Sequence, residues 1–486
     1  MLPHQQNIIK LMLLTEIPNY IQCKKISNLK NINFNKVYTN SSYITKSSVF
    51  VIEKKTRLKK KYIKEAIKKG AIAIITDEFI RNLSITQFVV FDIDLSLLNI
   101  LKKIKSNKPL NSIAITGTNG KTSVVWYFSQ ILNYINIPVK SYGTLGYYIN
   151  LKKKYSSQLT TPDFSTLYQT AYSSKKNLYS YIFEASSHAL SQNRIKNFKI
   201  DTAALTNISR DHMDYHKDFK KYKEAKLKLF FNHLKENGYA ILNDKIKGIE
   251  IIKNKLRKKV KIITFGMPKS DVSIIKDKKS VEITIFKKKY LIKTNLNSSI
   301  EFENLACAIA CSLSINIKST KILTILKKII NPPGRLQKVL NNNKNYKVFI
   351  DYAHTPEALK EVLISKTSNK KKPNIVFGCG GDRDKGKRKK MGRIANLYAN
   401  RIYITDDNPR FEDSSKIRQS ILKYCNSRAL EIPDRKKAII NAINDLKKNE
   451  TLIIAGKGHE SFQIVKNISY PLDDYKVAIK VLKKKL

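Results

Sequence analysis

Short apolar runs alternate with helical stretches along most of the chain, and this alternation predicts an α/β fold. Near the N-terminus, Ile63, Ala66 and Ile67 have helical spacing, Gly70 ends that helix, and an apolar strand follows at 71–75. Strands that alternate with helices are typical of parallel sheets with crossover connections. The later apolar runs are Ile113–Thr116, Tyr181–Glu184, Thr202–Thr206, Tyr239–Asn243, Val348–Asp351, Asn374–Phe377, Ile402–Thr405 and Leu452–Ala455.

Polar motifs follow nearly every one of these runs. Ligands of open α/β sheets bind beyond the carboxyl ends of the strands, so we expect the motifs to face one cleft system. Several motifs contain glycine, which is scarce here (16 in 486 residues, against a usual frequency of ~7%), as expected where the backbone approaches a ligand. The motifs are "ITGTNGKTS", "FEASSH", "LTNISRDHMDYH", "IDYAHTP", "FGCGGDRDKGK", "ITDDNPR" and "IAGKGHE".

The stretch "SIAITGTNGKTSVVWYF" (112–128) predicts a strand, a phosphate-binding loop and a helix. The longer pattern G-x-x-x-x-G-K-[ST] would need glycine where the chain has Ile115, so the loop is a short one. Its backbone N–H groups and the helix N-terminus can cradle an anion. Lys121 can hold the β- and γ-phosphates, and the Thr122 hydroxyl can ligate Mg²⁺. The alternative is an ordinary glycine turn before a helix, and the pattern favours nucleotide binding over it.

Two further side chains suit a metal ion. Glu184 closes one apolar run, and His212 lies in "SRDHMDYH". An oxygen and a nitrogen ligand from adjacent strands suit Mg²⁺ or Mn²⁺. Each residue alone is more often structural, but a phosphate loop on a neighbouring strand favours the metal interpretation.

The formal net charge of +54 raises a rival hypothesis, a basic P-loop ATPase that acts on nucleic acid. Such a protein should carry a lysine-rich stripe with interleaved aromatic residues. Here the lysines are spread along the whole chain, as a codon bias would spread them, so we expect no specific nucleic-acid partner.

Cysteine usage and hydropathy predict a cytoplasmic protein. The five cysteines form no C-x-x-C pair and their number is odd, which favours reduced thiols. No segment has the composition of a membrane span, and the N-terminal stretch lacks the basic leader of a signal peptide.

Together these motifs resemble the Mur ligases of peptidoglycan synthesis, over roughly residues 111–465. "GTNGKTS" is similar to the short phosphate loop of that family, and the other motifs follow in the family's order: "EASSHAL", "TNISRDHMDYH", "DYAHTPEAL", "VFGCGGDRDKGKR", "DNPR" and "AGKGHE". The resemblance implies three α/β domains. These are an N-terminal domain that binds the UDP end of the substrate (1–108), a central P-loop ATPase with a mostly parallel sheet (109–333), and a C-terminal Rossmann-like domain for the incoming amino acid (334–486). The breaks "KSNKP" (105–109) and "NPPGRLQ" (331–337) lie at the two junctions.

The resemblance also assigns residues to ATP, to metal and to the first substrate. It implies that Lys226, in "AKLKLF", is carbamylated by CO₂ and that its carbamate helps to hold Mg²⁺. The implied catalytic residues are Lys121, Glu184, His212 and Lys226, and the implied metal ligands are Thr122, Glu184, His212 and Lys226. Residues implied to contact ATP are Gly117, Thr118, Asn119, Gly120, Lys121, Thr122, Ser123, Asn304, Arg335 and Asp351. Those implied for the UDP-muramoyl dipeptide are Ser41, Thr160, Thr161, Ser186, Gln192 and Arg194.

The implied activity is ATP-dependent addition of an amino acid to UDP-N-acetylmuramoyl-L-alanyl-D-glutamate through an acyl phosphate. We expect a monomeric enzyme that serves cell-wall synthesis, cell shape and cell division. Arg410 in "DNPR" predicts meso-2,6-diaminopimelate as the amino acid, because a guanidinium reads a carboxylate with two parallel hydrogen bonds. The alternatives are a sibling ligase that uses L-lysine or another amino acid, and a surface pair between Arg410 and Glu412. The base that deprotonates the amine stays open, with His354 and His459 at strand ends. The implied amino-acid contacts are Arg383, Asp407, Asn408, Pro409, Arg410, Gly456 and Glu460.

Overall fold

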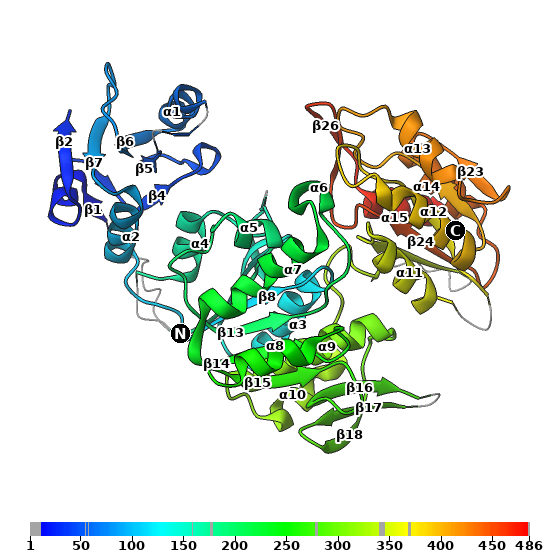
Figure 1. Cartoon of the computed structure of the whole chain (residues 1–486). Coiled ribbons are helices and arrows are strands. Elements are labelled where there is room, and N and C mark those ends of the chain that lie inside the picture. Colours follow the sequence, from blue (N-terminus) through cyan, green and yellow to red (C-terminus); the bar gives the residue numbers. More distant parts are fainter. Residues whose placement is uncertain are drawn as a thin grey trace, which may run out of the picture. The chain divides into compact units, whose positions relative to one another are not determined.

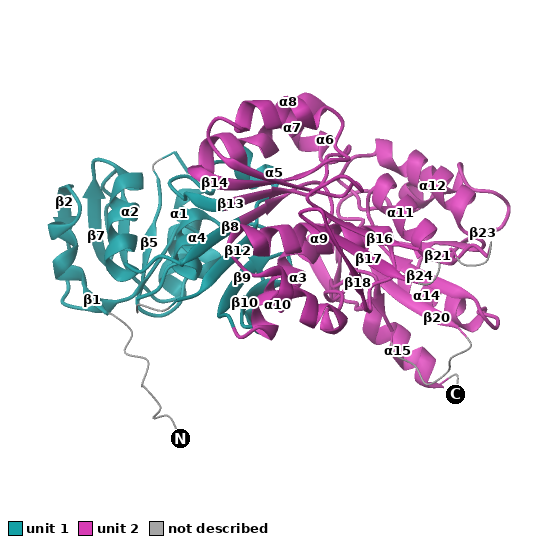
Figure 2. Ribbon diagram, turned by 90° about the horizontal axis from the view of Figure 1, so that it is seen from below, with its two compact units in different colours: residues 1–113, 137–201 teal, residues 114–136, 202–486 magenta. Residues whose placement is uncertain are grey.

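The computed structural model describes residues 11–53, 55–56, 58–157, 159–174, 178–277, 280–339, 346–367 and 371–484. The chain forms two compact units, one of residues 1–113 and 137–201 and the other of residues 114–136 and 202–486 (Figure 2). The division passes through strands β8 (Asn111–Thr116) and β13 (Ile200–Leu205). The three domain boundaries expected from the sequence stay a prediction. Within the described residues, no helix has the length and apolar character to span a membrane.

The first unit begins with a five-stranded sheet of order β2-β7-β6-β5-β4 (Figure 1). Its pairs are parallel except for β2 with β7. Helix α2 contributes to the core on one face through Leu97, Ile100 and Leu101, and α1 packs on the other through Ile63 and Ala66. The elements are β1 (Met12–Leu13), η1 (Leu14–Asn19), β2 (Cys23–Ser27), β3 (Asn33–Phe34), β4 (Lys36–Tyr38), η2 (Ser41–Tyr43), β5 (Ser48–Val51), α1 (Lys59–Lys68), β6 (Ala71–Thr76), β7 (Thr86–Val90) and α2 (Ile93–Ile104).

The rest of the first unit contains the strand run β11-β10-β9-β12, in which β9 and β12 are parallel and the other pairs antiparallel. β12 is buried along its whole length and delivers Glu184 at its carboxyl end. Asp163 caps α4 by accepting from the Thr166 amide, and Ser186 caps α5 in the same way with Ala189. The elements are β9 (Val139–Gly143), β10 (Gly146–Ile149), β11 (Lys152–Tyr155), α4 (Phe164–Ala171), β12 (Ser180–Glu184) and α5 (Ser187–Ser191).

The second unit starts with the strand run β8-β13-β14-β15-β16-β17-β18, with α3 and α9 packed against each other. β14, β15 and β16 pair in parallel, and the last two pairs are antiparallel. Its elements are α3 (Lys121–Tyr134), α6 (Met213–His216), α7 (Phe219–Lys228), η3 (Leu229–His233), β14 (Leu234–Asn243), α8 (Ile249–Leu256), β15 (Lys261–Phe265), β16 (Val272–Lys276), β17 (Val281–Ile285), β18 (Lys288–Ile292), α9 (Ser299–Ser314), α10 (Ser319–Ile325) and η4 (Leu326–Lys328).

A six-stranded sheet of order β19-β20-β24-β21-β22-β23 follows in the same unit. Alternate residues of β21, β22 and β24 pack in two cores: in β24, Ile453 packs with α11, α12 and α13, whereas Leu452 and Ile454 pack with α14 and α15. Helices therefore cover both faces. The elements are β19 (Gln337–Lys338), β20 (Lys347–Asp351), α11 (Pro356–Ser365), β21 (Asn374–Phe377), α12 (Gly386–Tyr398), β22 (Ile402–Ile404), α13 (Ser414–Leu422), β23 (Ala429–Glu431), α14 (Arg435–Asn444), β24 (Thr451–Ala455), β25 (Phe462–Val465), β26 (Ile468–Pro471) and α15 (Asp474–Lys484).

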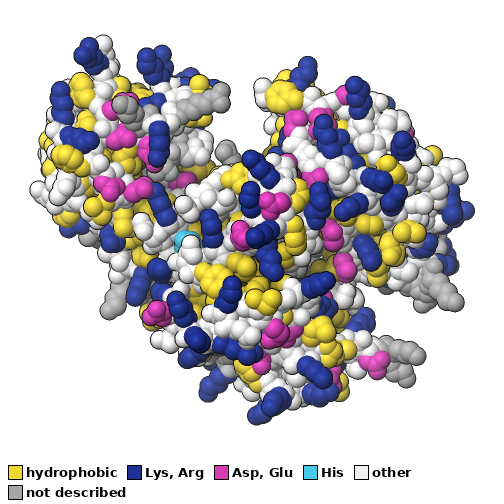
Figure 3. Space-filling view, viewed as in Figure 1, with side chains coloured by type: hydrophobic (Ala, Val, Ile, Leu, Met, Phe, Trp, Pro, Cys, Tyr) yellow, Lys and Arg dark blue, Asp and Glu magenta, His cyan; other side chains and the backbone are white. Residues whose placement is uncertain are grey.

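The α/β fold class with mostly parallel sheets is confirmed. Each apolar run from the sequence is a strand, and the helix that ends before Gly70 is α1. β20, β24, β21, β22 and β23 are joined by parallel pairs. Lys and Arg side chains are scattered over the face in Figure 3, with acidic and apolar side chains between them.

Candidate active site

The loop between β8 and α3 is shaped by two glycines in the left-handed region. Gly117 has φ +147° and Gly120 has φ +86°. A Cβ on Gly117 would collide with Thr206 Oγ1, and one on Gly120 would collide with the Asn304 side chain. Only glycine fits both positions, so the loop backbone stays bare of side chains on these sides, as the close approach of a phosphate requires.

Neighbouring segments hold this loop in place. Thr118 N donates to Asn207 O at 3.0 Å, and Asn119 N donates to Asn207 Oδ1 at 2.9 Å. Thr118 Oγ1 lies 3.0 Å from the Tyr222 hydroxyl, on α7. Lys121 Nζ donates to the carbonyl oxygens of Gly117 and Thr118, both at 2.8 Å. These contacts hold the loop in one conformation, and its binding of nucleotide phosphates through Lys121 stays a prediction.

Lys226 is buried directly beside the loop, with 1% of its surface exposed. Its Nζ donates to Gly117 O at 2.8 Å and lies 4.3 Å from the centre of the Tyr222 ring. Burial, and then the charge of Lys121, hold the pKa of Lys226 well below its usual range. The uncharged amine, which is the form that attacks CO₂, is therefore favoured here more than it is on a surface lysine.

Asn304, Arg335 and Asp351 also lie around the loop or the turn beside it. Arg335 Nη2 donates to Thr122 Oγ1 at 3.3 Å, and its guanidinium lies 4.0 Å from the Tyr352 ring centre. The Asp351 carboxylate accepts the amides of Leu336 and Ala353, each at 2.7 Å, so it fixes the turn that carries Arg335. Arg335 Nε is buried without a hydrogen-bond partner in the described part of the chain. An orphaned guanidinium donor beside a bare loop fits a phosphate group.

The residues predicted for Mg²⁺ fall in both units. Thr122, His212 and Lys226 belong to the second unit and Glu184 to the first, so the complete ligand set stays a prediction. Within residues that the structure describes, no group of three or more His, Cys, Asp or Glu side chains is arranged to hold a metal. A hydroxyl, an imidazole and a carboxylate are suitable donors, and Lys226 would join them only as an anion.

In the first unit, most residues predicted for the UDP-muramoyl dipeptide form one cluster. Thr161 Oγ1 donates to Glu184 O at 2.7 Å and accepts from Ser186 N at 2.9 Å. Arg194 Nη1 donates to Thr161 O at 3.1 Å, and Arg194 Nε donates to Gln192 Oε1 at 2.8 Å. The Glu184 carboxylate accepts from the Thr144 amide at 2.8 Å, and Thr144 Oγ1 lies 3.2 Å from Thr160 Oγ1.

Ser41 has different neighbours. Its buried hydroxyl donates to Glu65 Oε2 at 2.7 Å, on α1. Lys69 Nζ adds a donor to the Ser41 carbonyl at 3.3 Å and forms an ion pair with Glu65. The described contacts of Ser41 therefore bind its own loop to α1, and its role toward the UDP end stays a prediction.

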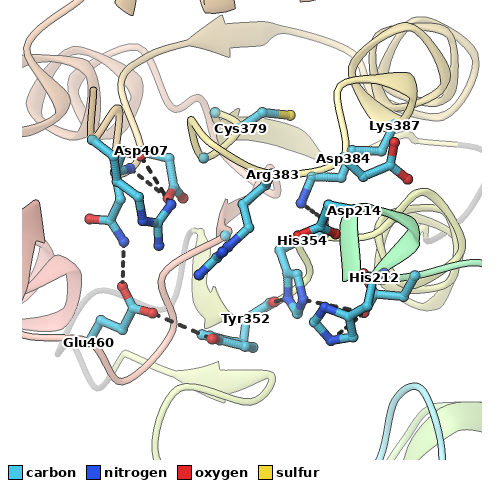
Figure 4. A pocket seen from close by; sticks show the side chains of 16 residues that line it. His212, Asp214, Tyr352, His354, Cys379, Arg383, Asp384, Lys387, Asp407 and Glu460 are labelled. Carbon is cyan, nitrogen blue, oxygen red and sulfur yellow. Dashed lines mark hydrogen bonds and ion pairs between the residues drawn. The ribbon is translucent and has the colours of Figure 1, made fainter. Parts of the chain in front are cut away.

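A pocket in the second unit collects the residues predicted for the amino acid (Figure 4). Six of the seven line it, and Pro409, the seventh, instead accepts from Glu412 N in the turn behind. Arg383 and His354 both point into the pocket in Figure 4, with Glu460 and Tyr352 hydrogen-bonded on one side of it. The lining residues are Asp211, His212, Asp214, Tyr352, His354, Gly378, Cys379, Gly380, Arg383, Asp384, Lys387, Asp407, Asn408, Arg410, Gly456 and Glu460.

Arg410 is held by its backbone and by one nitrogen. Its φ is +52°, its amide donates to Ile464 O at 3.1 Å, and its Nη1 donates to Gly381 O at 2.9 Å. Glu412 instead accepts from Arg388 Nη2 at 2.9 Å, so the surface pair between Arg410 and Glu412, which the sequence left open, is not the arrangement in the structure. Arg410 is one of the residues that line the pocket.

An acidic side chain that the sequence prediction missed lies between two histidines. Asp211 Oδ2 is 3.4 Å from His212 Nε2 and 4.0 Å from His354 Nε2. Burial acts to raise the pKa of Asp211, but the charges of His212, His354 and Lys387 outweigh it and the pKa is lowered. His354 Nδ1 lies 2.8 Å from Tyr352 O, and burial lowers the pKa of His354. Asp211 belongs to the motif "SRDHMDYH", but nothing in the sequence indicates that it lies close to the histidine of "DYAH".

Lys457 is the other missed residue. It is completely buried and contacts Asn408 and Glu460, two of the predicted amino-acid contacts. It stands in the middle of "AGKGHE", yet in a chain with 92 Lys and Arg residues a single lysine draws no notice. The sequence signal that could have drawn attention to Lys457 is the pair of glycines beside it, Gly456 and Gly458. Both adopt positive φ in the structure.

Comparisons with known proteins agree with this geometry. The Mur ligase middle domain matches residues 115–312, and the Mur ligase, glutamate ligase domain matches residues 334–458. A protein of Rickettsia rickettsii named UDP-N-acetylmuramoyl-L-alanyl-D-glutamate–2,6-diaminopimelate ligase is 38% identical over 438 residues, which cover 87% of this chain and 90% of that protein. A protein of the same name from Buchnera aphidicola subsp. Schizaphis graminum is 34% identical over 511 residues, covering 96% and 99%.

Solved structures give the same result. The structure of a ligase of that name is 27% identical, with a TM-score of 0.61, and the match covers 98% of this chain and 99% of that one. The MurF ligase of Thermotoga maritima in complex with ADP is 16% identical with a TM-score of 0.65, covers 93% and 99%, and shows the fold alone. The two relatives match at 38% and 34% identity over most of their length, and the two domain matches contain the phosphate loop and the "DNPR" motif. This chain therefore belongs to the Mur ligase family.

Proposed function

We propose that the chain is an ATP-dependent ligase that adds meso-2,6-diaminopimelate to UDP-N-acetylmuramoyl-L-alanyl-D-glutamate in peptidoglycan synthesis. The observation that carries the proposal is the pocket in which Arg383, Arg410, Asn408 and Glu460 converge. Two guanidinium groups suit carboxylates, and the Glu460 carboxylate suits an ammonium group. Diaminopimelate has a carboxylate and an ammonium group at each of its ends. The two curated relatives are named as ligases for 2,6-diaminopimelate.

The phosphate loop would carry the first step. The glutamyl carboxylate attacks the γ-phosphorus of ATP, the bond to the β-phosphate oxygen breaks, and ADP leaves an acyl phosphate behind. The amides of Gly117 to Thr122 and the Lys121 ammonium bind and orient the phosphates, and Arg335, whose Nη2 donates to Thr122 Oγ1, lies beside the loop as a further cation. Bound Mg²⁺ would neutralise charge on the transferred phosphoryl group, and the Thr122 hydroxyl and the His212 imidazole of the second unit are suitable ligands for it.

Lys226 would serve this step as a carbamate. Its amine attacks CO₂, a C–N bond forms, and one proton is released, which leaves an anion beside Gly117. The lowered pKa favours the uncharged amine that the reaction needs. The carbamate would place a negative charge at the loop, where it could serve as an oxygen ligand for Mg²⁺.

In the second step, the amine of diaminopimelate attacks the acyl carbon, phosphate leaves, and the amine gives up a proton. The pocket residues hold the amino acid for that attack and exclude water from it. We further propose that the protein works in the cytoplasm as a monomer, with small molecules as its partners and without specific nucleic-acid binding.

A phosphate-release assay tests the proposal. The purified protein is given ATP, Mg²⁺ and UDP-muramoyl dipeptide, with diaminopimelate, L-lysine or no amino acid, and the product is identified by mass spectrometry. We expect release that depends on both the dipeptide and diaminopimelate, and a product heavier by one diaminopimelate residue. Faster release with lysine would make the chain a sibling ligase. Release that depends on DNA, and not on the dipeptide, would favour the nucleic-acid ATPase.

A further inference from the structure

Lys457 lies behind the amino-acid pocket with none of its surface exposed. Its Nζ donates to Asn408 Oδ1 at 3.0 Å, to Glu460 Oε2 at 2.9 Å and to Phe462 O at 2.6 Å. An ammonium group has three N–H donors, and each has an acceptor here. The contacts join three segments: the loop after β22, the loop after β24 and the first residue of β25.

These contacts determine which way the Asn408 amide points. Besides Lys457, the amide of Ile464 donates to Asn408 Oδ1, at 2.9 Å. Because both neighbours are donors, that atom must be the oxygen. Asn408 Nδ2 then faces Glu460, and it donates to Oε2 at 3.0 Å. Asn408 can therefore offer only N–H, never C=O, to a molecule in the pocket.

Lys457 also makes the two carboxylate oxygens of Glu460 different from each other. Oε2 accepts from both Lys457 and Asn408. Oε1 makes a long contact of 3.4 Å with the Tyr352 hydroxyl. A substrate ammonium group would therefore bind to Oε1. The hydrogen bonds from Lys457 and Asn408 to Oε2 keep the carboxylate from rotating.

We propose that Lys457 is a positioning residue for amino-acid recognition, which acts through Asn408 and Glu460 and does not touch the substrate. The inference rests on the proposed function, because it names the residue that presets the pocket of that function. A lysine with a purely structural role would change the stability of the fold without changing the affinity for one substrate selectively.

The test compares Lys457→Met with the wild type in the phosphate-release assay, with KM measured for each of the three substrates. Loss of the buried donor leaves Glu460 and Asn408 without their common partner, so we expect the KM for diaminopimelate to rise roughly 10- to 100-fold. The KM values for ATP and UDP-muramoyl dipeptide should stay within about twofold, because the phosphate loop is untouched. Should Lys457→Met fail to fold, Lys457→Gln keeps two N–H donors and is measured in its place.

Lys253→Met is the matched control. Lys253 is another buried lysine of the same unit, with Nζ 2.6 Å from Asp244 and 2.7 Å from Glu250 on and near α8. We expect Lys253→Met to lower Tm and to leave all three KM values unchanged. An equal rise of all three KM values in Lys457→Met, or no rise, overturns the inference.

A double-mutant cycle separates positioning from simple loss of stability. If Lys457 acts through Glu460, Lys457→Met should add little to Glu460→Gln, within about threefold in KM, whereas independent effects would multiply. Multiplied effects contradict the inference. If the wild type itself shows no release with diaminopimelate, the proposed function fails and the inference with it. If the wild type is active and Lys457→Met has normal KM values, only the inference fails.

Discussion

Replacement of Arg410 by alanine should remove most of the selectivity for diaminopimelate over L-lysine. The two amino acids differ by one carboxylate at the far end. Arg410 Nη1 is fixed by Gly381 O at 2.9 Å, and within the described residues the Nε–Nη2 edge of the guanidinium is left for a ligand. That edge offers two parallel N–H donors to a carboxylate.

The magnitude follows from those two bonds. A hydrogen bond to a charged group contributes about 1.5–3 kcal/mol, so two contribute about 3–6 kcal/mol, or roughly 10²- to 10⁴-fold in binding. Lysine would also leave the guanidinium unpaired, which adds to the discrimination. We therefore expect the wild type to prefer diaminopimelate by roughly 10³-fold in kcat/KM, and Arg410→Ala to lose most of that factor.

The assay is phosphate release at saturating ATP and dipeptide, with each amino acid varied in turn. Arg393→Ala is the control, because it removes an exposed guanidinium from α12, outside the pocket. Arg410→Lys keeps the charge but loses the planar pair of donors, so it should recover only a small part of the preference. Comparable wild-type rates with the two amino acids, or a full preference in Arg410→Ala, would refute the reasoning. An altered KM for ATP in Arg410→Ala would point to a wider disturbance.

Three further predictions concern other parts of the chain. Lys226→Ala should lower turnover by about 10²-fold or more, as for lost transition-state electrostatics, and a short-chain carboxylic acid should partly restore it; full activity of the variant would exclude a carbamate role. Burial, and then Lys105, lower the pKa of Lys140 from 10.5 to about 8. Between those two pH values the folded protein binds fewer protons than the unfolded chain. The loss of stability caused by burying the charged form of Lys140 is therefore complete below pH 8 and fades toward pH 10.5. Lys140→Met should therefore raise the free energy of unfolding at pH 7 by at most about 3 kcal/mol and raise Tm accordingly. At pH 10.5 the same thermal scan should show little effect of the substitution. An equal gain in Tm at both pH values would contradict the assigned pKa. DNA binding should be weak and steeply salt-dependent, with a Kd around 10⁻⁴–10⁻⁶ M at physiological salt, and tight, sequence-selective binding in a fluorescence titration would favour the nucleic-acid class.

The elements that the sequence predicted well are those whose information is local. β21, β22 and β24 are short apolar runs between helical stretches, so their type follows from run length and period alone. The phosphate loop is likewise contained in one contiguous motif, and its two glycines have the positive φ that the motif requires. The amino-acid pocket was predicted through resemblance, because its members come from separate motifs that no spacing rule connects.

The residues that the sequence did not predict depend on long-range contacts. Asp211 and His354 are 143 positions apart in the chain but 4.0 Å apart in the fold (354 − 211 = 143). Ser41 is a different case: the resemblance implied a contact with the UDP end of the substrate, which stays a prediction, and the hydrogen bond of its hydroxyl to Glu65 on α1 could not be read from the sequence. A residue type at the expected position does not fix the partner that its side chain takes, because the neighbouring helix competes for the same hydrogen bond.

In a chain with a net charge of +54, the surface cations carry little information, whereas the buried ones carry a great deal. Burial of an ammonium or guanidinium group costs free energy unless partners replace its water. Arg435 has the Asp474 carboxylate at 2.7 Å, and Lys457 has Glu460 at 2.9 Å. Lys226 forms no ion pair with a carboxylate among the described residues. Its Nζ contacts the Gly117 carbonyl and the Tyr222 ring, with the positive charge of Lys121 nearby. Burial, and then the charge of Lys121, lower the pKa of Lys226 and so favour loss of its positive charge, and a carbamate anion at this position would be attracted to Lys121, where an ammonium group is repelled by it.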